Sequence, residues 1–197
     1  MRACAVMARH LLLILLCLSG CSKTLYVDGV PNYYRVDVGI RRSGQPTTLK
    51  QWQTIWRDLE SERPGRPHYV VKLNFDDEGS SDLATQAGFV LLKHPIQPAA
   101  DKDVFDNLAN TFVQPTDAEV DAIERDVAAH ADDGELIQCT HGQDRTSYAV
   151  GRDRVLRLKW LKINAYAEMV TYGFHGPGGP QPTLHGLHEK WENFKAP

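Results

Sequence analysis

The chain has 197 residues, of which 42% are hydrophobic and 24% are charged, a composition typical of a soluble globular protein with one sizeable core. Its net charge of −3 argues against a nucleic-acid partner, because proteins that bind nucleic acid carry a strongly basic surface. A small anionic ligand stays compatible with this charge, since a local basic pocket is enough to bind one.

The first 20 residues are predicted to form an export signal. Arg2 and Arg9 precede an apolar run, Leu11–Leu18. That run is too short to cross a bilayer as a helix, which needs about 20 apolar residues. It ends in Leu-Ser-Gly-Cys21, which resembles the lipobox of bacterial lipoproteins.

The lipobox resemblance implies that the signal, residues 1–20, is removed and that Cys21 carries lipid. Residues 21–32 are then a lipid-tethered linker, and residues 33–197 form a single domain. The protein is expected on the periplasmic or cell-envelope side, in contact with the membrane only through its N-terminal lipid. Ser22 resembles the pattern that sorts lipoproteins to the outer membrane.

Strands and helices alternate in the first half of the chain. The expected elements are strands over 33–37 and 39–42, a helix from Thr48 to Glu60 capped by Thr47, a strand over 68–73, an acidic loop over 74–81, a short helix, and a strand over 89–93.

The second half is predicted to be richer in helix. The expected elements are a helix near 104–108, a helix from the capping box Thr116-x-x-Glu119 to Ala131, a short buried strand over 135–138, helices over 145–161 and 164–172, and a last helix ending near Phe194. Because strands alternate with helices, we expect an α/β domain in which helices cover a sheet.

The segment that carries chemistry lies between the predicted strand at 135–138 and the following helix, and reads Cys139-Thr-His-Gly-Gln-Asp-Arg145-Thr146. Unpaired backbone N–H groups at a helix start attract anions, and the same field favours a thiolate over a thiol. Arg145 can make two parallel charge-assisted bonds to a phosphoryl group. One loop therefore supplies a nucleophile, an anion cradle and a charge clamp.

The cysteine count supports a role for this thiol. If the signal is removed with Cys4 and Cys17, and Cys21 carries lipid, Cys139 is the one free thiol left. An exported protein with a single unpaired cysteine usually retains it for function. The alternative is a small buried apolar cysteine, which the neighbouring Gly142 and Arg145 disfavour.

The loop, in its place between strand and helix, resembles the active-site signature of the protein tyrosine and dual-specificity phosphatase superfamily. Two further stretches are similar to its compact bacterial members, the turn over 40–46 (Ile-Arg-Arg-Ser-Gly-Gln-Pro) and the segment over 164–175 that contains Ala-Glu-Met. The resemblance implies a protein tyrosine phosphatase-like fold, with a central mixed sheet of about five strands flanked by helices. It implies no metal and no organic cofactor.

The resemblance also implies roles for the loop residues. Thiolate Cys139 attacks phosphorus, while Arg145 and the loop N–H groups stabilise the equatorial oxygens. Thr146 is expected to hydrogen-bond the sulfur. The other substrate-binding candidates are Thr140, His141, Gly142, Gln143 and Asp144.

The general acid is expected to be an aspartate. The superfamily usually takes it from a loop before the cysteine, where Asp101 is the first choice and Asp103 the second. Asp144 is a third candidate, because a carboxylate beside a bound dianion has a raised pKa, which suits an acid. Two positions depart from the usual pattern, with Gln138 in place of histidine and Ser147 in place of glycine.

Two substrate classes fit the sequence, a phosphotyrosine peptide and an inositol phosphate. Export favours inositol polyphosphates, because the phosphatase-like phytases of this superfamily are likewise exported, and such a substrate needs a wide pocket ringed with cations. The candidate cations are Arg41, Arg42, Lys93, His94, Lys102, His141, Arg152 and Lys159. Alternatives of other kinds are a phosphate-binding pseudophosphatase and a metal site at His175, His185 and His188.

Overall fold

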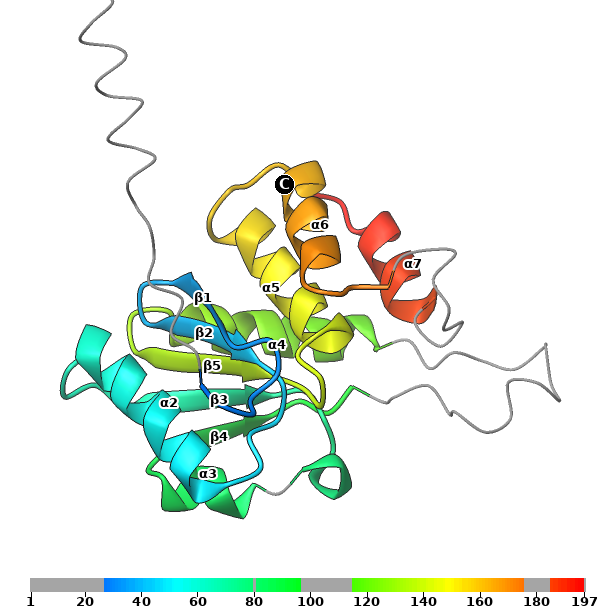
Figure 1. Cartoon of the computed structure of the whole chain (residues 1–197). Helices are drawn as coiled ribbons and strands as arrows, with labels where there is room; N and C mark the ends of the chain where they lie inside the picture. The colour runs from blue at the N-terminus through cyan, green and yellow to red at the C-terminus, as the bar shows by residue number, and fades with distance from the viewer. Residues whose placement is uncertain (1–26, 80, 97–114, 176–184, 197) are drawn as a thin grey trace, which may run out of the picture.

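The computed structural model describes residues 27–79, 81–96, 115–175 and 185–196 (Figure 1). Several sequence predictions lie outside these residues: the export signal, lipidation at Cys21, the acid candidates Asp101 and Asp103, and the helix near 104–108. None of the described helices is long and apolar enough to cross a membrane.

Five strands form one mixed sheet, as predicted. They are β1 (Tyr34–Asp37), β2 (Ile40–Ser43), β3 (His68–Lys72), β4 (Val90–Lys93) and β5 (Gly134–Gln138), in the order β1-β2-β5-β3-β4. Strand β1 is antiparallel to β2, and the other pairs are parallel. The carboxyl ends of β2, β3, β4 and β5 therefore meet at one edge, with β5 in the middle.

Helices cover both faces of this sheet (Figure 1). One face carries α2 (Leu49–Glu62) and α3 (Asp82–Gln86). The other carries α4 (Asp117–Ala129), α5 (Asp144–Leu156), α6 (Lys162–Thr171) and α7 (His185–Asn193). The α/β class predicted from the sequence is confirmed.

Each face of the sheet has its own apolar core. Leu136 belongs to the core under α2, and Ile137 belongs to the core under α4 and α5. Successive strand side chains point to opposite faces, so one buried strand serves both cores. This explains why β5 is buried at every position, and it fixes the residue that follows, Cys139, at the centre of the sheet edge.

Most element boundaries differ from the sequence prediction by a few residues, and three differences have a local explanation. Helix α2 is capped by Thr48, not Thr47, because the Thr48 hydroxyl accepts the Gln51 N–H while the Gln51 side chain accepts the Thr48 N–H. Helix α5 ends at Leu156, since Lys159 adopts a left-handed conformation (φ 58°). The acidic loop after β3 contains one helical turn, η1 (Asp76–Glu78).

Candidate active site

The predicted loop runs from the end of β5 to the start of α5. Cys139 is 3% exposed and is the free cysteine of the described residues. Gly142 has a φ of +68°, and a Cβ there would lie 2.3 Å from the Gly44 backbone nitrogen. Only glycine tolerates both conditions, so the loop is wrapped tightly against the turn that follows β2.

Arg145 lies in the first turn of α5, and a carboxylate that the sequence analysis did not identify holds its side chain. Its Nη1 and Nη2 donate to Glu78 Oε2 and Oε1 at 2.8 and 2.7 Å. Nη1 also donates to the Ile96 carbonyl at 3.1 Å. The guanidinium is thus fixed from two sides, by η1 and by the chain just beyond β4.

This ion pair changes the titration of both partners. Burial alone would raise the pKa of the Glu78 carboxyl, but its bonds with Arg145 and the Phe75 N–H hold that pKa at about 2. Burial alone would lower the pKa of Arg145, and the bonds with Glu78 raise it instead. Both groups are charged at neutral pH. The signal in the sequence was the acidic triplet Asp76–Glu78, which begins four residues after the end of β3, whose carboxyl end adjoins that of β5.

The two threonines of the loop, Thr140 and Thr146, differ in the contacts that their hydroxyl groups make. Thr140 Oγ1 donates to Glu78 at 2.8 Å and accepts from Arg145 at 2.9 Å, so it belongs to the ion-pair network. Thr146 is fully buried, and its hydroxyl has no hydrogen-bond partner among the described residues. The bond expected between Thr146 and the Cys139 sulfur is therefore not formed in this structure.

Asp144, the third candidate for the acid, is bound to a residue far along the chain. Its Oδ1 accepts the His175 N–H at 2.8 Å and lies 3.0 Å from His175 Nδ1. These bonds tie the start of α5 to the segment after α6. The contacts favour an orienting role for Asp144 over proton transfer to a substrate.

Gln138, which stands where the superfamily usually has histidine, begins a chain of amides. Its Nε2 donates to Asn74 Oδ1, and Asn74 Nδ2 donates to Gln45 Oε1, both at 3.2 Å. All three side chains are buried. The chain links the carboxyl ends of β5 and β3 to the turn after β2, so it braces the sheet edge on which the loop stands.

Arg42, one of the candidate cations for an inositol polyphosphate, is buried and contacts the loop from outside. It is 1% exposed, and its Nη2 donates to the Gly142 carbonyl at 2.7 Å and to Ser147 Oγ at 2.8 Å. Its guanidinium carbon lies 4.3 Å from the Tyr172 ring centroid. Burial lowers the pKa of Arg42 to about 10, which leaves it cationic at neutral pH.

Most of the other candidate cations on described residues are paired with carboxylates. Arg41 pairs with Asp58, Lys93 with Asp76, His94 with Asp126 and Arg152 with Glu124, while Lys159 is exposed beyond the far end of α5 and Lys102 is outside the described residues. Of that set, His141 lies on the loop itself and is exposed. Four of the candidate cations on described residues are thus already paired with carboxylates.

The metal site considered at the C-terminal histidines finds no support in the described part of the chain. No group of three or more metal-ligating side chains occurs there. His175 contacts Asp144, and His188 Nε2 lies 3.5 Å from Glu192.

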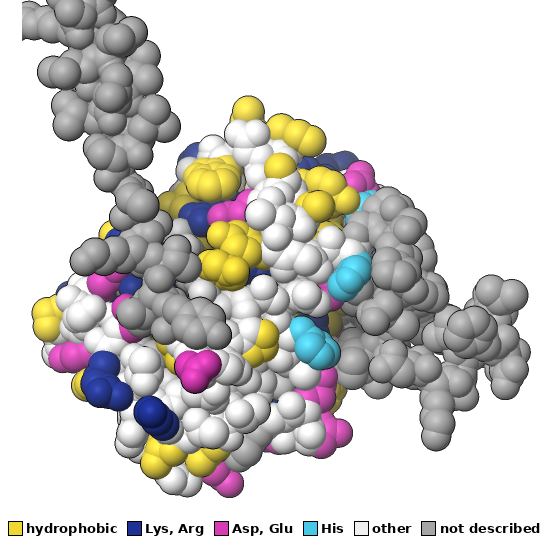
Figure 2. All heavy atoms as spheres, in the orientation of Figure 1, with side chains coloured by type: hydrophobic (Ala, Val, Ile, Leu, Met, Phe, Trp, Pro, Cys, Tyr) yellow, Lys and Arg dark blue, Asp and Glu magenta, His cyan; other side chains and the backbone are white. Residues whose placement is uncertain are grey.

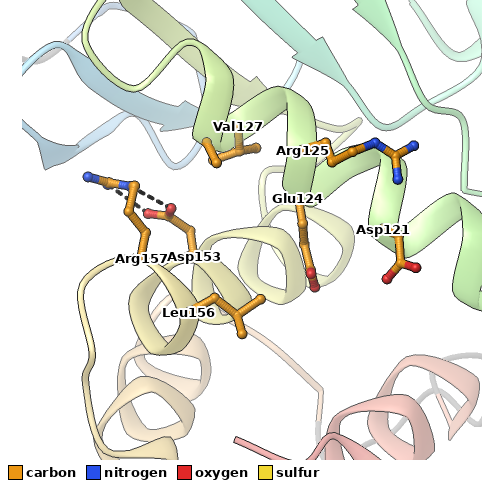
Figure 3. Close-up of a pocket in the computed structure, with 8 residues that line it drawn as sticks. Asp121, Glu124, Arg125, Val127, Asp153, Leu156 and Arg157 are labelled. Atoms are coloured by element: carbon orange, nitrogen blue, oxygen red, sulfur yellow. Dashed lines mark hydrogen bonds and ion pairs between the residues drawn. The ribbon is translucent and has the colours of Figure 1, made fainter. Parts of the chain in front are cut away.

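A separate groove lies between α4 and α5, away from the loop (Figure 3). It has a volume of about 490 Å³, and its lining residues include Glu124 and Val127 of α4 and Asp153 and Leu156 of α5. Arg157 closes one side through two bonds to Asp153. None of the predicted site residues lines this groove.

The sequence matches no protein-family model and no curated protein. The fold does match solved structures. The structure of TpbA from P. aeruginosa has a TM-score of 0.58 and 22% identity, covering 89% of this chain and 99% of that one. The structure of a cysteine-to-serine variant of TpbA in complex with phosphotyrosine (pTyr) has a TM-score of 0.57 and 21% identity, with the same coverage of both chains.

Two further structures match over most of their length. The Siw14 catalytic core has a TM-score of 0.59 and 17% identity, covering 88% of this chain and 89% of that one. The structure of PTPMT1 in complex with PI(5)P has a TM-score of 0.55 and 16% identity, covering 82% of this chain and 95% of that one. The fold is that of the protein tyrosine phosphatase-like phosphatases, as the sequence predicted.

Proposed function

We propose that this protein hydrolyses phosphate monoesters through a cysteinyl-phosphate intermediate. The observation that carries the proposal is the loop from Cys139 to Arg145, closed at the carboxyl edge of a phosphatase-like sheet with its arginine pinned by Glu78. The sulfur and the guanidinium belong to one rigid segment, which is what in-line attack on a phosphoryl group needs.

The reaction has two steps. The Cys139 thiolate attacks phosphorus, the bond to the ester oxygen breaks, and an acid supplies the proton that the leaving oxygen takes. Water then attacks the cysteinyl phosphate, the S–P bond breaks, and inorganic phosphate and the thiolate are released. Arg145 and the loop N–H groups stabilise the equatorial oxygens in both steps. Asp101 stays our first candidate for the acid, with Asp103 as the alternative.

For the substrate we place a phosphotyrosine-type monoester first and an inositol polyphosphate second. Export favoured the inositol class, but of the candidate cations on described residues His141 belongs to the loop, while Arg41, Lys93, His94 and Arg152 are already paired with carboxylates. The structure of a related fold with phosphotyrosine supports the first class. The complex of PTPMT1 with PI(5)P keeps a phosphoinositide among the candidates.

The test is phosphate release from a phosphotyrosine peptide, a phosphoinositide and phytate by the purified domain. We expect the highest kcat/KM on the peptide, and no turnover of any ester by Cys139→Ser. A clear preference for phytate would reverse the order of substrates. A wild-type protein that binds phosphate and turns over none of the three would instead be a pseudophosphatase.

We also propose that the protein is an exported lipoprotein anchored through Cys21. The apolar run and lipobox-like sequence before this residue support the proposal. Expression of the full chain in a bacterium, followed by membrane fractionation and mass spectrometry of the N-terminal peptide, tests it. Cys21→Ser is expected to move the protein to the soluble fraction; a wild-type chain that is already soluble and unlipidated would contradict the anchor.

A further inference from the structure

Three consecutive carbonyl groups of the catalytic loop are held from outside the loop. The Thr140 carbonyl accepts the Gln45 N–H at 3.0 Å. The His141 carbonyl accepts Asn32 Nδ2 at 2.9 Å. The Gly142 carbonyl accepts Arg42 Nη2 at 2.7 Å. The three donors come from the segment before β1, from β2 and from the turn after β2.

These bonds determine where the loop's N–H groups point. In a planar trans peptide the C=O of one residue and the N–H of the next point in opposite directions. A carbonyl of Thr140, His141 or Gly142 that is drawn outward therefore turns the N–H of the following residue inward. Successive N–H groups with a common direction form a concavity that binds anions.

We propose that Arg42 and Asn32 are positioning residues that aim the amides of Gly142 and Gln143 at the phosphoryl group. The inference rests on the proposed function, because it takes the loop to be the phosphate site. Neither side chain touches the substrate in this scheme. Gln45 acts in the same way through its backbone, which a side-chain substitution does not remove.

The surroundings of Arg42 fit a role in support of the loop. Its Nε and Nη1 have no hydrogen-bond partner in the described part of the chain, so the contacts with Gly142, Ser147 and the Tyr172 ring account for its placement. A buried arginine with unpaired donors is costly to folding. This free-energy cost is consistent with an arginine that was selected for its contacts with the loop and not for the stability of the fold.

Binding of inorganic phosphate to the Cys139→Ser background, measured by calorimetry, tests the inference without turnover. Arg42→Met keeps the side-chain volume and removes the donors, and we expect phosphate affinity to fall about tenfold. Arg42→Lys returns a donor and is expected to recover part of the loss. A role limited to stability would lower the melting temperature and leave the affinity of the folded protein unchanged.

Asn32 offers a second test that does not alter the core. It has a φ of 52°, so Asn32→Gly removes the side-chain donor while the backbone keeps its conformation. We expect phosphate affinity to fall about threefold. The matched control is Lys159→Gly, another residue of positive φ (58°), at the opposite end of α5, for which affinity should stay the same.

The outcomes separate the two proposals. If the background binds phosphate and both Arg42→Met and Asn32→Gly bind it within about twofold of that value, the positioning role is wrong and the phosphatase proposal stands. If the background does not bind phosphate at all, the loop is not a phosphate site and both proposals fail. If Arg42→Met does not fold, Asn32→Gly alone decides.

Discussion

Arg145 and Glu78 lie 67 positions apart in the chain, yet they form a two-pronged ion pair at the centre of the site. Such a pair holds the guanidinium plane in one orientation, which a single bond cannot do. Removing one partner leaves the other charge half-buried and unpaired. Glu78 is therefore expected to matter for both catalysis and stability.

Glu78→Gln should lower kcat/KM by about tenfold or more, because Arg145 loses the contact that orients it. The same change should alter acid stability. The folded-state pKa of Glu78 is about 2, below the usual 4.5, so its stabilisation is complete above pH 4.5 and is lost as the pH falls toward 2. After solvent screening this amounts to about 1–2 kcal/mol.

Urea unfolding between pH 7 and pH 2.5 measures this contribution of Glu78. The wild type should lose more stability over the acid range than Glu78→Gln. The exposed neighbour provides the control, since Asp77→Asn is expected to leave both kcat/KM and the acid profile as they are. Parallel acid profiles for wild type and Glu78→Gln would show that the ion pair does not stabilise the fold.

Asp101→Asn tests the general acid. If Asp101 protonates the leaving oxygen, turnover should fall far more for alkyl phosphates, whose leaving groups need a proton, than for activated aryl phosphates. We expect a loss of about a hundredfold or more on the former and less than about tenfold on the latter. Equal losses on both ester types would remove Asp101 from this role, and a selective loss in Asp103→Asn would assign the role to Asp103.

At the scale of elements, strand β5 carries a buried acid that the site does not use. Glu135 is 0% exposed, and its carboxylate oxygens have no hydrogen-bond partner among the described residues. Burial first, and the neighbouring Asp153 second, raise the pKa of Glu135 well above its usual value. The protonated form of Glu135 is therefore favoured in the fold relative to the unfolded chain.

Because folding raises the pKa of Glu135, its contribution to stability changes with pH in the direction opposite to that of Glu78. The stabilisation from protonated Glu135 is complete below the unfolded pKa of 4.5 and is lost as the pH rises through the folded-state value. Glu135→Gln should remove part of the decline in unfolding free energy as the pH rises above 4.5. The control Glu189→Gln, at an exposed position, should not change this decline. If Glu135→Gln shows the same decline as the wild type, Glu135 is not its source.

At the scale of the whole molecule, two cores meet at the sheet and the site lies at its edge. The larger core extends to α7, where Trp191 is 1% exposed and packs on α5. By contrast, Figure 2 shows hydrophobic side chains on the surface over α6. They include Leu161 and Ile163, each 68% exposed. Truncation of a buried and of an exposed apolar side chain should therefore have different effects on the free energy of unfolding.

Trp191→Ala should lower the free energy of unfolding by about 3–5 kcal/mol, the usual cost of removing a large buried aromatic side chain. Trp191 packs beside Gly151 in the middle of α5, not at the start of that helix where the loop ends, so kcat/KM measured well below the melting temperature should change little. Leu161→Ala, which removes an exposed side chain, should shift stability by less than about 0.5 kcal/mol. A loss of kcat/KM in folded Trp191→Ala would instead mean that α7 supports the loop.

Local patterns along the chain were enough to predict the five-stranded α/β fold and the nucleophile–arginine loop. Strand alternation, capping boxes and the spacing from Cys139 to Arg145 depend on neighbours in sequence. The boundaries that failed, at Thr48 and at Leu156, depend on single caps and on one left-handed residue, which propensity does not resolve.

The sequence by itself determined which atoms are available for the proposed chemistry, because the Cys139 thiol, the loop N–H groups and the Arg145 guanidinium fall within one short loop. Only the tertiary structure decided which residues hold these groups in place. Glu78 binds Arg145, Arg42 and Asn32 donate hydrogen bonds to the loop carbonyls, and His175 contacts Asp144. Each of these contacts joins residues more than 30 positions apart. No local spacing encodes them, since they exist only after parallel strands bring their carboxyl ends to a common edge.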